Sequence, residues 1–135
     1  MIIYKYSTDN ITPNMLKGFF DGWPNPPSRT KHLEILNKSD YIVLAIDDEV
    51  NRVVGFINAI SDNIMSAYIP ILEVLPRYQG EGIGKELVKR MLEKLENLYM
   101  VDLICDSYLI PFYSSFGMKT GSGMMLRKYS KQNCK

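Results

Sequence analysis

Three glycines fall within five residues, between a β-prone run and the most regular helical pattern of the chain. They are Gly80, Gly82 and Gly84, with Gln79 before them and Lys85 after them. Glycine adopts positive φ readily and lets a ligand come close to the backbone. The first amides of a helix have no partner within the helix, and the helix dipole favours an anion beside them. The segment therefore predicts a cradle for a pyrophosphate, with positive charge added by Lys85.

The spacing of these residues excludes two common phosphate-binding loops. A P-loop needs Gly-Lys-Ser/Thr, but Glu86 follows Gly84-Lys85, and Gln79 stands where its first glycine would be. A dinucleotide-binding Gly-x-Gly-x-x-Gly would need a glycine where Lys85 stands. The pattern Gln/Arg-x-x-Gly-x-Gly/Ala matches without exception, at Gln79, Gly82 and Gly84. A tight strand-to-helix turn without a ligand is the alternative, although three glycines exceed what such a turn requires.

Two segments together carry a resemblance to a known family. The run from Val74 to Gly84 resembles the acetyl-CoA-binding motif of the GNAT superfamily of N-acetyltransferases. The run from Pro111 to Met118 resembles the later signature of that family, an aromatic-Tyr pair followed by Phe-Gly. The two motifs occur in the order of the family, and the predicted elements resemble its fold over almost the whole chain. The resemblance implies one N-acetyltransferase domain over residues 1–135, with acetyl-CoA as co-substrate.

The resemblance also implies which residues bind the co-substrate. Backbone amides of the glycine loop would hold the CoA pyrophosphate, and the end of the preceding strand would pair with the pantetheine arm and polarise the thioester carbonyl. After the next strand, where the family often has Asn, this chain has Asp106 or Ser107. The residues expected to bind acetyl-CoA are Val74, Leu75, Gln79, Gly80, Glu81, Gly82, Ile83, Gly84, Lys85, Asp106, Ser107 and Phe112.

Transfer of an acyl group from a thioester to an amine makes chemical demands on the protein. A free alkylamine has a pKa near ~10.4, so a base or a water relay must deprotonate it. The oxyanion needs hydrogen-bond donors, and the departing thiolate benefits from a proton donor. Tyr113 matches the family tyrosine that reaches the CoA sulfur, so the resemblance implies that role. A core aromatic beside Phe112 and Phe116 is the alternative.

The general base has three candidates. Related enzymes use a Glu or His on the strand before the glycine loop, and Tyr68 lies near that counterpart position, although a phenol is not a ready base at neutral pH. Glu73 is the only carboxylate on the strand, with a structural or surface role as its alternative. His32 could reach the site from the early helices, although a lone histidine more often has no catalytic role. The expected catalytic residues are Tyr113, Glu73 and Tyr68.

The run from Phe19 to Pro24 lies where the family shapes its acceptor pocket. Its aromatic side chains could line a site for an apolar amine, and Asp21 could attract a cationic one; hydrophobic packing of a loop is the alternative. We expect the acceptor to be a primary amine of a small molecule, such as an arylalkylamine or a polyamine. Two alternatives remain open: acetylation of a protein amine, and a non-catalytic role in binding CoA. A nucleotide-binding regulator is disfavoured, because the chain matches neither the P-loop nor the dinucleotide-binding pattern.

Apolar periodicity and turn residues predict the elements that position these side chains. We expect an α/β fold, a mixed and mostly antiparallel central sheet with helices on both faces, in which Met65 to Cys105 forms a parallel strand–helix–strand unit. Pro70 predicts a bulge or an unpaired stretch within one strand. The predicted strands are 2–6, 41–46, 53–60, 65–75, 100–105 and 124–128, and the predicted helices are 12–20, 28–36, 82–97 and 111–115.

Composition limits the remaining function classes. The chain has 135 residues and a formal net charge of +1. This overall charge does not favour binding to nucleic acid or to an anionic membrane. Its two cysteines, Cys105 and Cys134, lack metal-ligand spacing to each other or to His32, so no metal site and no disulfide are expected. No apolar run approaches the ~18 residues of a membrane span. We expect a cytoplasmic protein, either a monomer or a homodimer.

Overall fold

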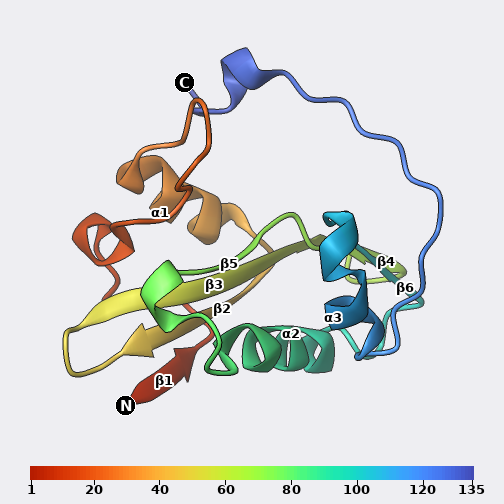
Figure 1. Ribbon diagram of the computed structural model, residues 1–135, viewed down its shortest axis with the longest axis horizontal. Coiled ribbons are helices and arrows are strands. Elements are labelled where there is room, and N and C mark those ends of the chain that lie inside the picture. The colour runs from red at the N-terminus through yellow and green to blue at the C-terminus, as the bar shows by residue number, and fades with distance from the viewer.

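A six-stranded sheet lies at the centre of the molecule (Figure 1). The computed structural model describes all residues from 1 to 135. The strands are β1 (Ile2–Lys5), β2 (Tyr41–Asp47), β3 (Arg52–Ser61), β4 (Ser66–Tyr68), β5 (Leu72–Val74) and β6 (Met100–Asp102). The helices are α1 (Arg29–Lys38), α2 (Ile83–Lys94) and α3 (Ile110–Ser114), and the 3-10 turns are η1 (Pro13–Leu16), η2 (Pro76–Tyr78), η3 (Ser107–Leu109) and η4 (Tyr129–Lys131).

The strands pair in the order β1-β2-β3-β4-β6, and β5 also pairs with β3. All of these pairs are antiparallel except β4 with β6, which is parallel. The parallel pair is the one that needs a long crossover, and α2 supplies it. The mixed, mostly antiparallel sheet and the parallel strand–helix–strand unit are therefore confirmed.

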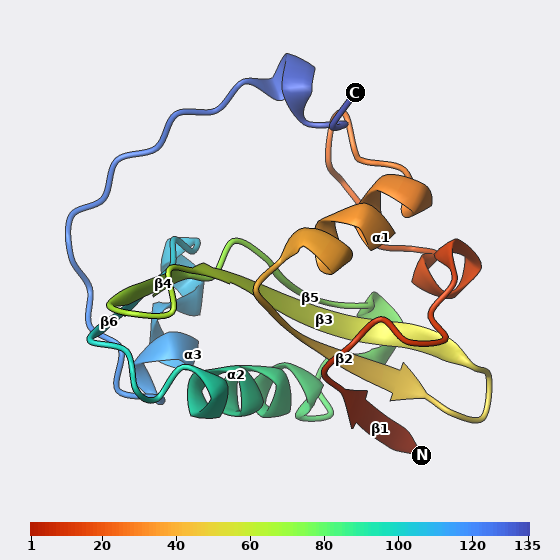
Figure 2. The same ribbon diagram turned by 180° about the vertical axis from the view of Figure 1, so that it is seen from behind.

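Helices cover both faces of the sheet, because apolar side chains alternate between the faces of β2 (Figures 1 and 2). Val43 and Ala45 belong to the core cluster under α2 and α3, whereas Ile42, Leu44 and Ile46 belong to the cluster under α1 and η1. The apolar stripe of α2 contributes buried Ile83, Leu87, Val88 and Met91. The expectation of helices on both faces is confirmed.

The sheet divides at Pro70. On one side of it, Ile69 N donates to Asp102 O at 2.9 Å and continues the β4–β6 pairing; on the other side, β5 pairs only with β3. Proline has no N–H to donate to a ladder, which explains why the pairing changes partner there. The predicted run 65–75 is thus two short strands, and the unpaired stretch expected at Pro70 is present.

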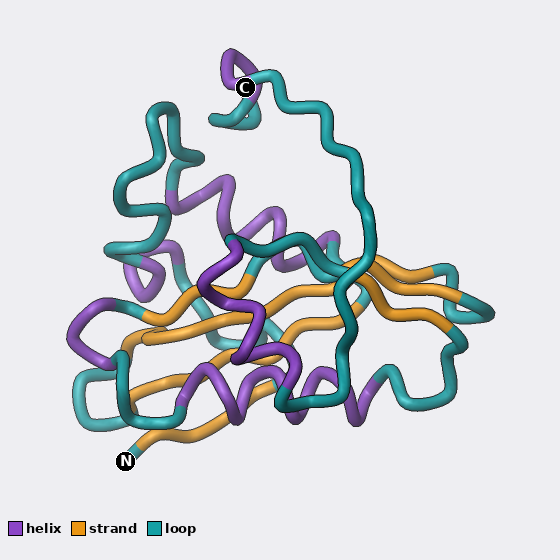
Figure 3. The backbone as a smooth tube through the Cα atoms, turned by 45° about the vertical axis from the view of Figure 1, so that its right-hand side comes forward, coloured by secondary structure: helices purple, strands orange, loops and turns teal.

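Two predicted elements are wrong. The helix expected over 12–20 is only the turn η1, because Gly18 and Phe20 have φ values of +98° and +64°, outside the helical region. The strand expected over 124–128 has no partner strand. It belongs to an extended segment of exposed residues, 119–128, which we call the C-terminal arm (Figure 3).

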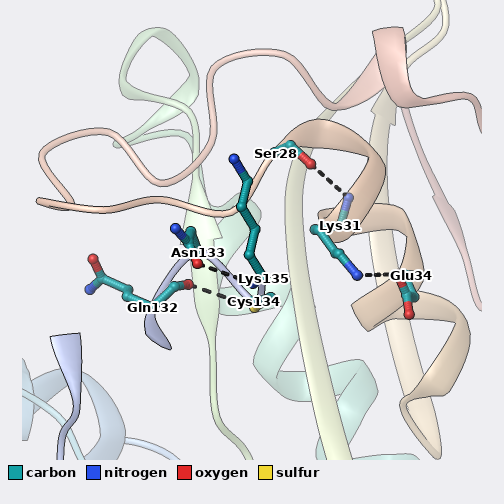
Figure 4. Close-up of polar contacts among 7 residues, drawn as sticks. All are labelled: Ser28, Lys31, Glu34, Gln132, Asn133, Cys134 and Lys135. Atoms are coloured by element: carbon teal, nitrogen blue, oxygen red, sulfur yellow. Dashed lines mark hydrogen bonds and ion pairs between the residues drawn. The ribbon is translucent and has the colours of Figure 1, made fainter. Parts of the chain in front are cut away.

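The chain ends in a compact turn that returns to the loop before α1. Asn25 N donates to Gln132 Oε1 at 2.8 Å, and Asn25 Nδ2 donates to Tyr129 O at 3.1 Å. Close by in the chain, Ser28 Oγ accepts from Lys31 N and caps α1. Figure 4 shows this cap and the contacts within the last four residues. No helix of the structure is both long and apolar enough to cross a membrane.

Candidate functional site

The glycine loop forms an uncapped helix start. Gly80 and Gly82 have φ values of +80° and +86°, in the left-handed region that favours glycine. Gly82 is the N-cap of α2 and has no side chain to satisfy the first amides, and the first helical hydrogen bond runs from Glu86 N to Gly82 O. The amides of Ile83, Gly84 and Lys85 therefore have no partner within the helix. A Cβ at Gly82 would meet no protein atom within 4 Å, so the space over the loop is open.

Two side chains hold the turn that leads into this loop. The Tyr78 hydroxyl donates to Asp47 Oδ2 at 2.7 Å, which ties η2 to the end of β2. Gln79 Nε2 donates to the carbonyl oxygen of Val74 at 2.9 Å, which ties the loop to the end of β5. The start of α2 is thereby fixed relative to the strand before it.

The backbone of β5 has one free edge. Ile71 O accepts from Asn58 N, and Leu75 N donates to Val54 O at 2.8 Å, so these two residues bond toward β3. Residues of an antiparallel strand alternate in the direction of their main-chain groups, so the main chain of Val74 faces away from β3. The Val74 amide is available to a ligand, whereas the Leu75 amide is already hydrogen-bonded to Val54 in β3.

The end of β5, the start of α2 and the helix α3 converge at one point. A Cβ placed at Gly84 would lie 3.8 Å from Val74 Cγ2 and 3.9 Å from Phe112 Cζ. The Phe112 ring packs edge-to-face on Tyr113, with the ring centroids 5.0 Å apart. The structure therefore brings together residues from the two sequence motifs.

Tyr113 is 8% exposed and belongs to the core cluster beneath α2. Burial raises the pKa of its hydroxyl to about 12, and the neighbouring Cys105 contributes to the rise. The phenol is therefore protonated at any physiological pH and can serve as a donor. Its packing also agrees with the core role that the sequence left open.

A cavity of about 330 Å³ lies beside β5. Val74, Glu73 and Gln79 supply one wall, and Trp23 and Asp21 from the loop before α1 supply another. Apolar surface and two carboxylates thus face the same space. Its lining residues are Asp21, Trp23, Ile71, Leu72, Glu73, Val74, Pro76 and Gln79.

The surroundings of Glu73 in this cavity shift the pKa of its carboxyl. Burial raises the pKa of its carboxyl, the charge of Asp21 raises it further, and a hydrogen bond from Phe20 N opposes the rise. Both carboxylate oxygens lie 3.0 Å from that amide nitrogen. Nothing in the sequence pattern signals this contact, because the two residues are 53 positions apart.

The other candidate bases lie elsewhere. Tyr68 is on β4, on the far side of Pro70, and does not line the cavity. His32 is 1% exposed and packs against Phe19, Phe20 and Phe56. Neither of its ring nitrogens has a hydrogen-bond partner, and burial lowers its pKa to about 4. It is a neutral core residue.

Five of the twelve residues expected on the CoA side are exposed around the glycine loop, namely Gln79, Gly80, Glu81, Gly82 and Lys85. Ile83 is buried under the helix. Asp106 and Ser107 are exposed at the start of η3, beyond the end of β6. No group of three or more His, Cys, Asp or Glu side chains is arranged to hold a metal ion.

Curated relatives match most of this chain. Histone acetyltransferase TAP1 of Glycine max is 30% identical over 73% of the chain, and an uncharacterized N-acetyltransferase, ycf52, of Porphyra purpurea is 30% identical over 85%. The chain spans 47% and 69% of these two proteins, respectively. The matched region is thus about half of the soybean relative.

Solved structures share the fold. A candidate acetyltransferase from Deinococcus radiodurans R1 is 43% identical, with a TM-score of 0.95 over 98% of this chain and 92% of its own. That extent includes most of the C-terminal arm. A GNAT-family acetyltransferase from Streptococcus pneumoniae is 28% identical, with a TM-score of 0.72 over 95% of this chain and 98% of its own.

A sequence model described as the acetyltransferase (GNAT) family matches residues 9–118. The match includes β5, the glycine loop, α2 and α3, the elements that converge at the site. The chain therefore belongs to the acetyltransferase (GNAT) family.

Proposed function

We propose that this chain, as a single domain over residues 1–135, transfers the acetyl group of acetyl-CoA to a primary amine. The observation that carries the proposal is the free edge of β5 next to the uncapped start of α2. Main-chain donors at Val74 and at Ile83 to Lys85 face open space on two adjoining elements. An extended acyl-pantetheine chain that ends in a pyrophosphate needs donors in that order.

The loop amides bind the pyrophosphate in this proposal. Three amides at a helix start offer hydrogen bonds together with the positive end of the helix dipole, and the Lys85 ammonium adds a charge. The Glu81 carboxylate would repel a pyrophosphate, so at this position the loop contributes through its backbone and not through the side chain. The positive φ at Gly80 and Gly82 keeps the loop in the shape that presents these amides.

The Val74 amide polarises the thioester carbonyl and stabilises the oxyanion as the amine attacks. A fixed main-chain donor is effective here, because it needs no reorganisation when charge develops. The hydrogen bond from Gln79 to the Val74 carbonyl keeps this peptide group in place. Leu75, expected to share the role, contributes packing instead, since its amide is bonded to Val54.

Glu73 removes the proton from the attacking amine, directly or through water. Its carboxyl lines the cavity, and burial raises its pKa, which makes the carboxylate a stronger base than an exposed one. Tyr68 has no place in this scheme, because it lies outside the cavity. On the other side of the reaction, the protonated Tyr113 hydroxyl donates a hydrogen bond to the departing thiolate of CoA, which stabilises the charge on sulfur while the phenol keeps its proton.

The acceptor enters beside Trp23 and Asp21. The indole offers an apolar surface, and the two carboxylates favour a group that arrives as an ammonium ion. A small arylalkylamine or polyamine fits these surroundings. The second candidate acceptor is a protein amine, because the soybean relative is named a histone acetyltransferase. A peptide that contains a lysine represents this class of acceptor. A cytoplasmic location stays a prediction.

A panel of amines tests the proposed reaction. Purified protein is incubated with acetyl-CoA and tryptamine, spermidine or a lysine-containing peptide, and both thiol release and the acetylated product are measured. We expect product with at least one amine, and product with only the peptide would select the protein acceptor. Bound acetyl-CoA without turnover in any arm would favour a non-catalytic CoA-binding protein.

A further inference from the structure

The C-terminal arm is apolar and unpacked. Met124 is 98% exposed, Leu126 is 84% exposed and Met125 is 61% exposed, and every residue from 119 to 128 is exposed. The arm has the composition that led us to expect a strand, and yet no main-chain ladder includes it. Large apolar side chains held out in water on an extended backbone indicate a missing partner.

Both ends of the arm are fixed to the body of the protein. At the near end, Phe116 and Met118 pack against the core cluster under α2 and α3. The far end is held at Asn25 by Tyr129, Gln132 and Asn133. The arm between these two anchors arches away from the sheet (Figures 1 and 3). The arm is therefore a segment held at both ends and not a frayed tail.

Strand β6, at one of the two ends of the sheet, has an unpaired edge that suits such a strand. β6 pairs with β4 on one side only and ends the sheet on the other. The residues in and after this strand expose apolar side chains, namely Met100, Ile104, Tyr108 and Ile110. An open edge with exposed apolar residues is a template for strand addition.

Charge favours the pairing of these two segments. The edge carries exposed Asp102 and Asp106, whereas the end of the arm carries Arg127 and Lys128. One chain thus contains both an unpaired strand and an unpaired edge of opposite charge. Two copies related by a twofold axis can pair both segments at once. The arm of each copy then pairs with the β6 edge of the other copy.

We propose that the C-terminal arm adds a strand, centred on residues 124–128, to the β6 edge of a second copy of this chain. The chain is then a homodimer with exchanged arms. Met124 and Leu126 lie on the same face of that strand, because side chains alternate with a period of two. They pack against the exposed apolar residues of the second copy.

The test compares the wild type with Met124→Glu/Leu126→Glu by sedimentation at micromolar concentration. We expect the wild type to sediment at about 31 kDa, twice the 15.5 kDa of one chain, and the variant at the mass of one chain. Both side chains are exposed in the single chain, so the variant keeps its fold and its circular dichroism spectrum. Val50→Glu is the matched control, since Val50 is an exposed apolar residue (58%) in the β2–β3 turn, and it should remain dimeric.

Hydrogen exchange locates the contact. Amides of 124–128 and of Met100 to Cys105 should be protected in the wild type and lose protection together in the double variant. A monomeric wild type would overturn the proposal, including one whose arm amides are protected by its own β6. A double variant that remains dimeric would overturn it as well, because the copies would then associate through another surface.

Discussion

The backbone amide of Phe20 lies 3.0 Å from both carboxylate oxygens of Glu73 and donates a hydrogen bond to them. This contact joins the loop that carries Asp21 and Trp23 to strand β5. The acceptor side of the cavity and the proposed base are therefore held by one interaction. Changes at Glu73 can act on chemistry or on the loop, and a useful variant has to separate the two.

Glu73→Gln is that variant, because the amide oxygen can still accept from Phe20 while the side chain can no longer take a proton. We expect kcat to fall roughly 100-fold, within the range of a positioned general base, with little loss of thermal stability. In the wild type, kcat should rise with pH through a carboxyl pKa above the ordinary value and then level off, because only the ionised form accepts the proton. The variant should lose that limb of the pH profile.

Glu93→Gln serves as the control for this measurement, since Glu93 is exposed on α2. It should behave as the wild type at every pH. If Glu73→Gln keeps both the wild-type rate and the wild-type profile, another group or a water chain deprotonates the amine.

Gly82→Val should weaken CoA binding. The new side chain would stand in the open space over the loop, and the left-handed backbone would disfavour it by about 1–2 kcal/mol. Loss of one hydrogen bond to a charged group costs about 1.5–3 kcal/mol, so we expect affinity to fall roughly 10- to 100-fold. Gly22→Val controls for backbone strain, because Gly22 has a similar φ of +80° in the acceptor-side loop. Equal CoA affinity in the two folded variants would mean that the pyrophosphate lies elsewhere.

Tyr113→Phe tests the donor to the thiolate. The interaction strengthens only as charge develops on sulfur, so the change should act on the transition state. We expect kcat to fall roughly 100-fold while the CoA dissociation constant stays within about threefold. The ring and its packing remain, so melting temperature should hardly change. Tyr108→Phe, at a 76% exposed position on η3, is the control. Wild-type turnover in Tyr113→Phe would assign this residue to the core alone.

His32 makes the stability of the protein sensitive to acid. The unfolded chain binds a proton at the ordinary pKa of 6.5, but the buried ring binds one only near 4, so folding loses stability as pH falls through that window. One pKa unit is worth ~1.4 kcal/mol, and the loss amounts to about 3 kcal/mol between about pH 7 and about pH 4. His32→Leu should remove it. Urea unfolding of the wild type and of His32→Leu at several pH values measures the free energy of unfolding of each protein. If this free energy falls equally with pH in both proteins, His32 is not the cause.

The glycine loop and α2 could be predicted from the sequence because their signals are local. The motif spacing and the apolar stripe lie within one segment, and both reappear in the structure as an uncapped helix start and a buried face. The helix expected over 12–20 failed because Gly18 and Phe20 adopt positive φ, which a helical pattern of apolar residues does not reveal.

The long-range features of the site could not be predicted in the same way. The contact between Phe20 and Glu73, and the choice of Val74 over Leu75 as the free amide, depend on how β5 pairs with β3. The strand expected over 124–128 has β-prone residues but no partner strand within the chain. Local propensity identifies such a segment, whereas its pairing depends on the rest of the sheet.

Direct binding of acetyl-CoA is the measurement closest to the central claim. Titration calorimetry with acetyl-CoA, and with CoA as competitor, measures it without any knowledge of the acceptor amine. The account predicts saturable binding of one acetyl-CoA per chain, displacement by CoA, and a higher melting temperature in its presence, since a ligand that binds only the folded state stabilises it. No binding and no shift in melting temperature at millimolar acetyl-CoA would contradict the account.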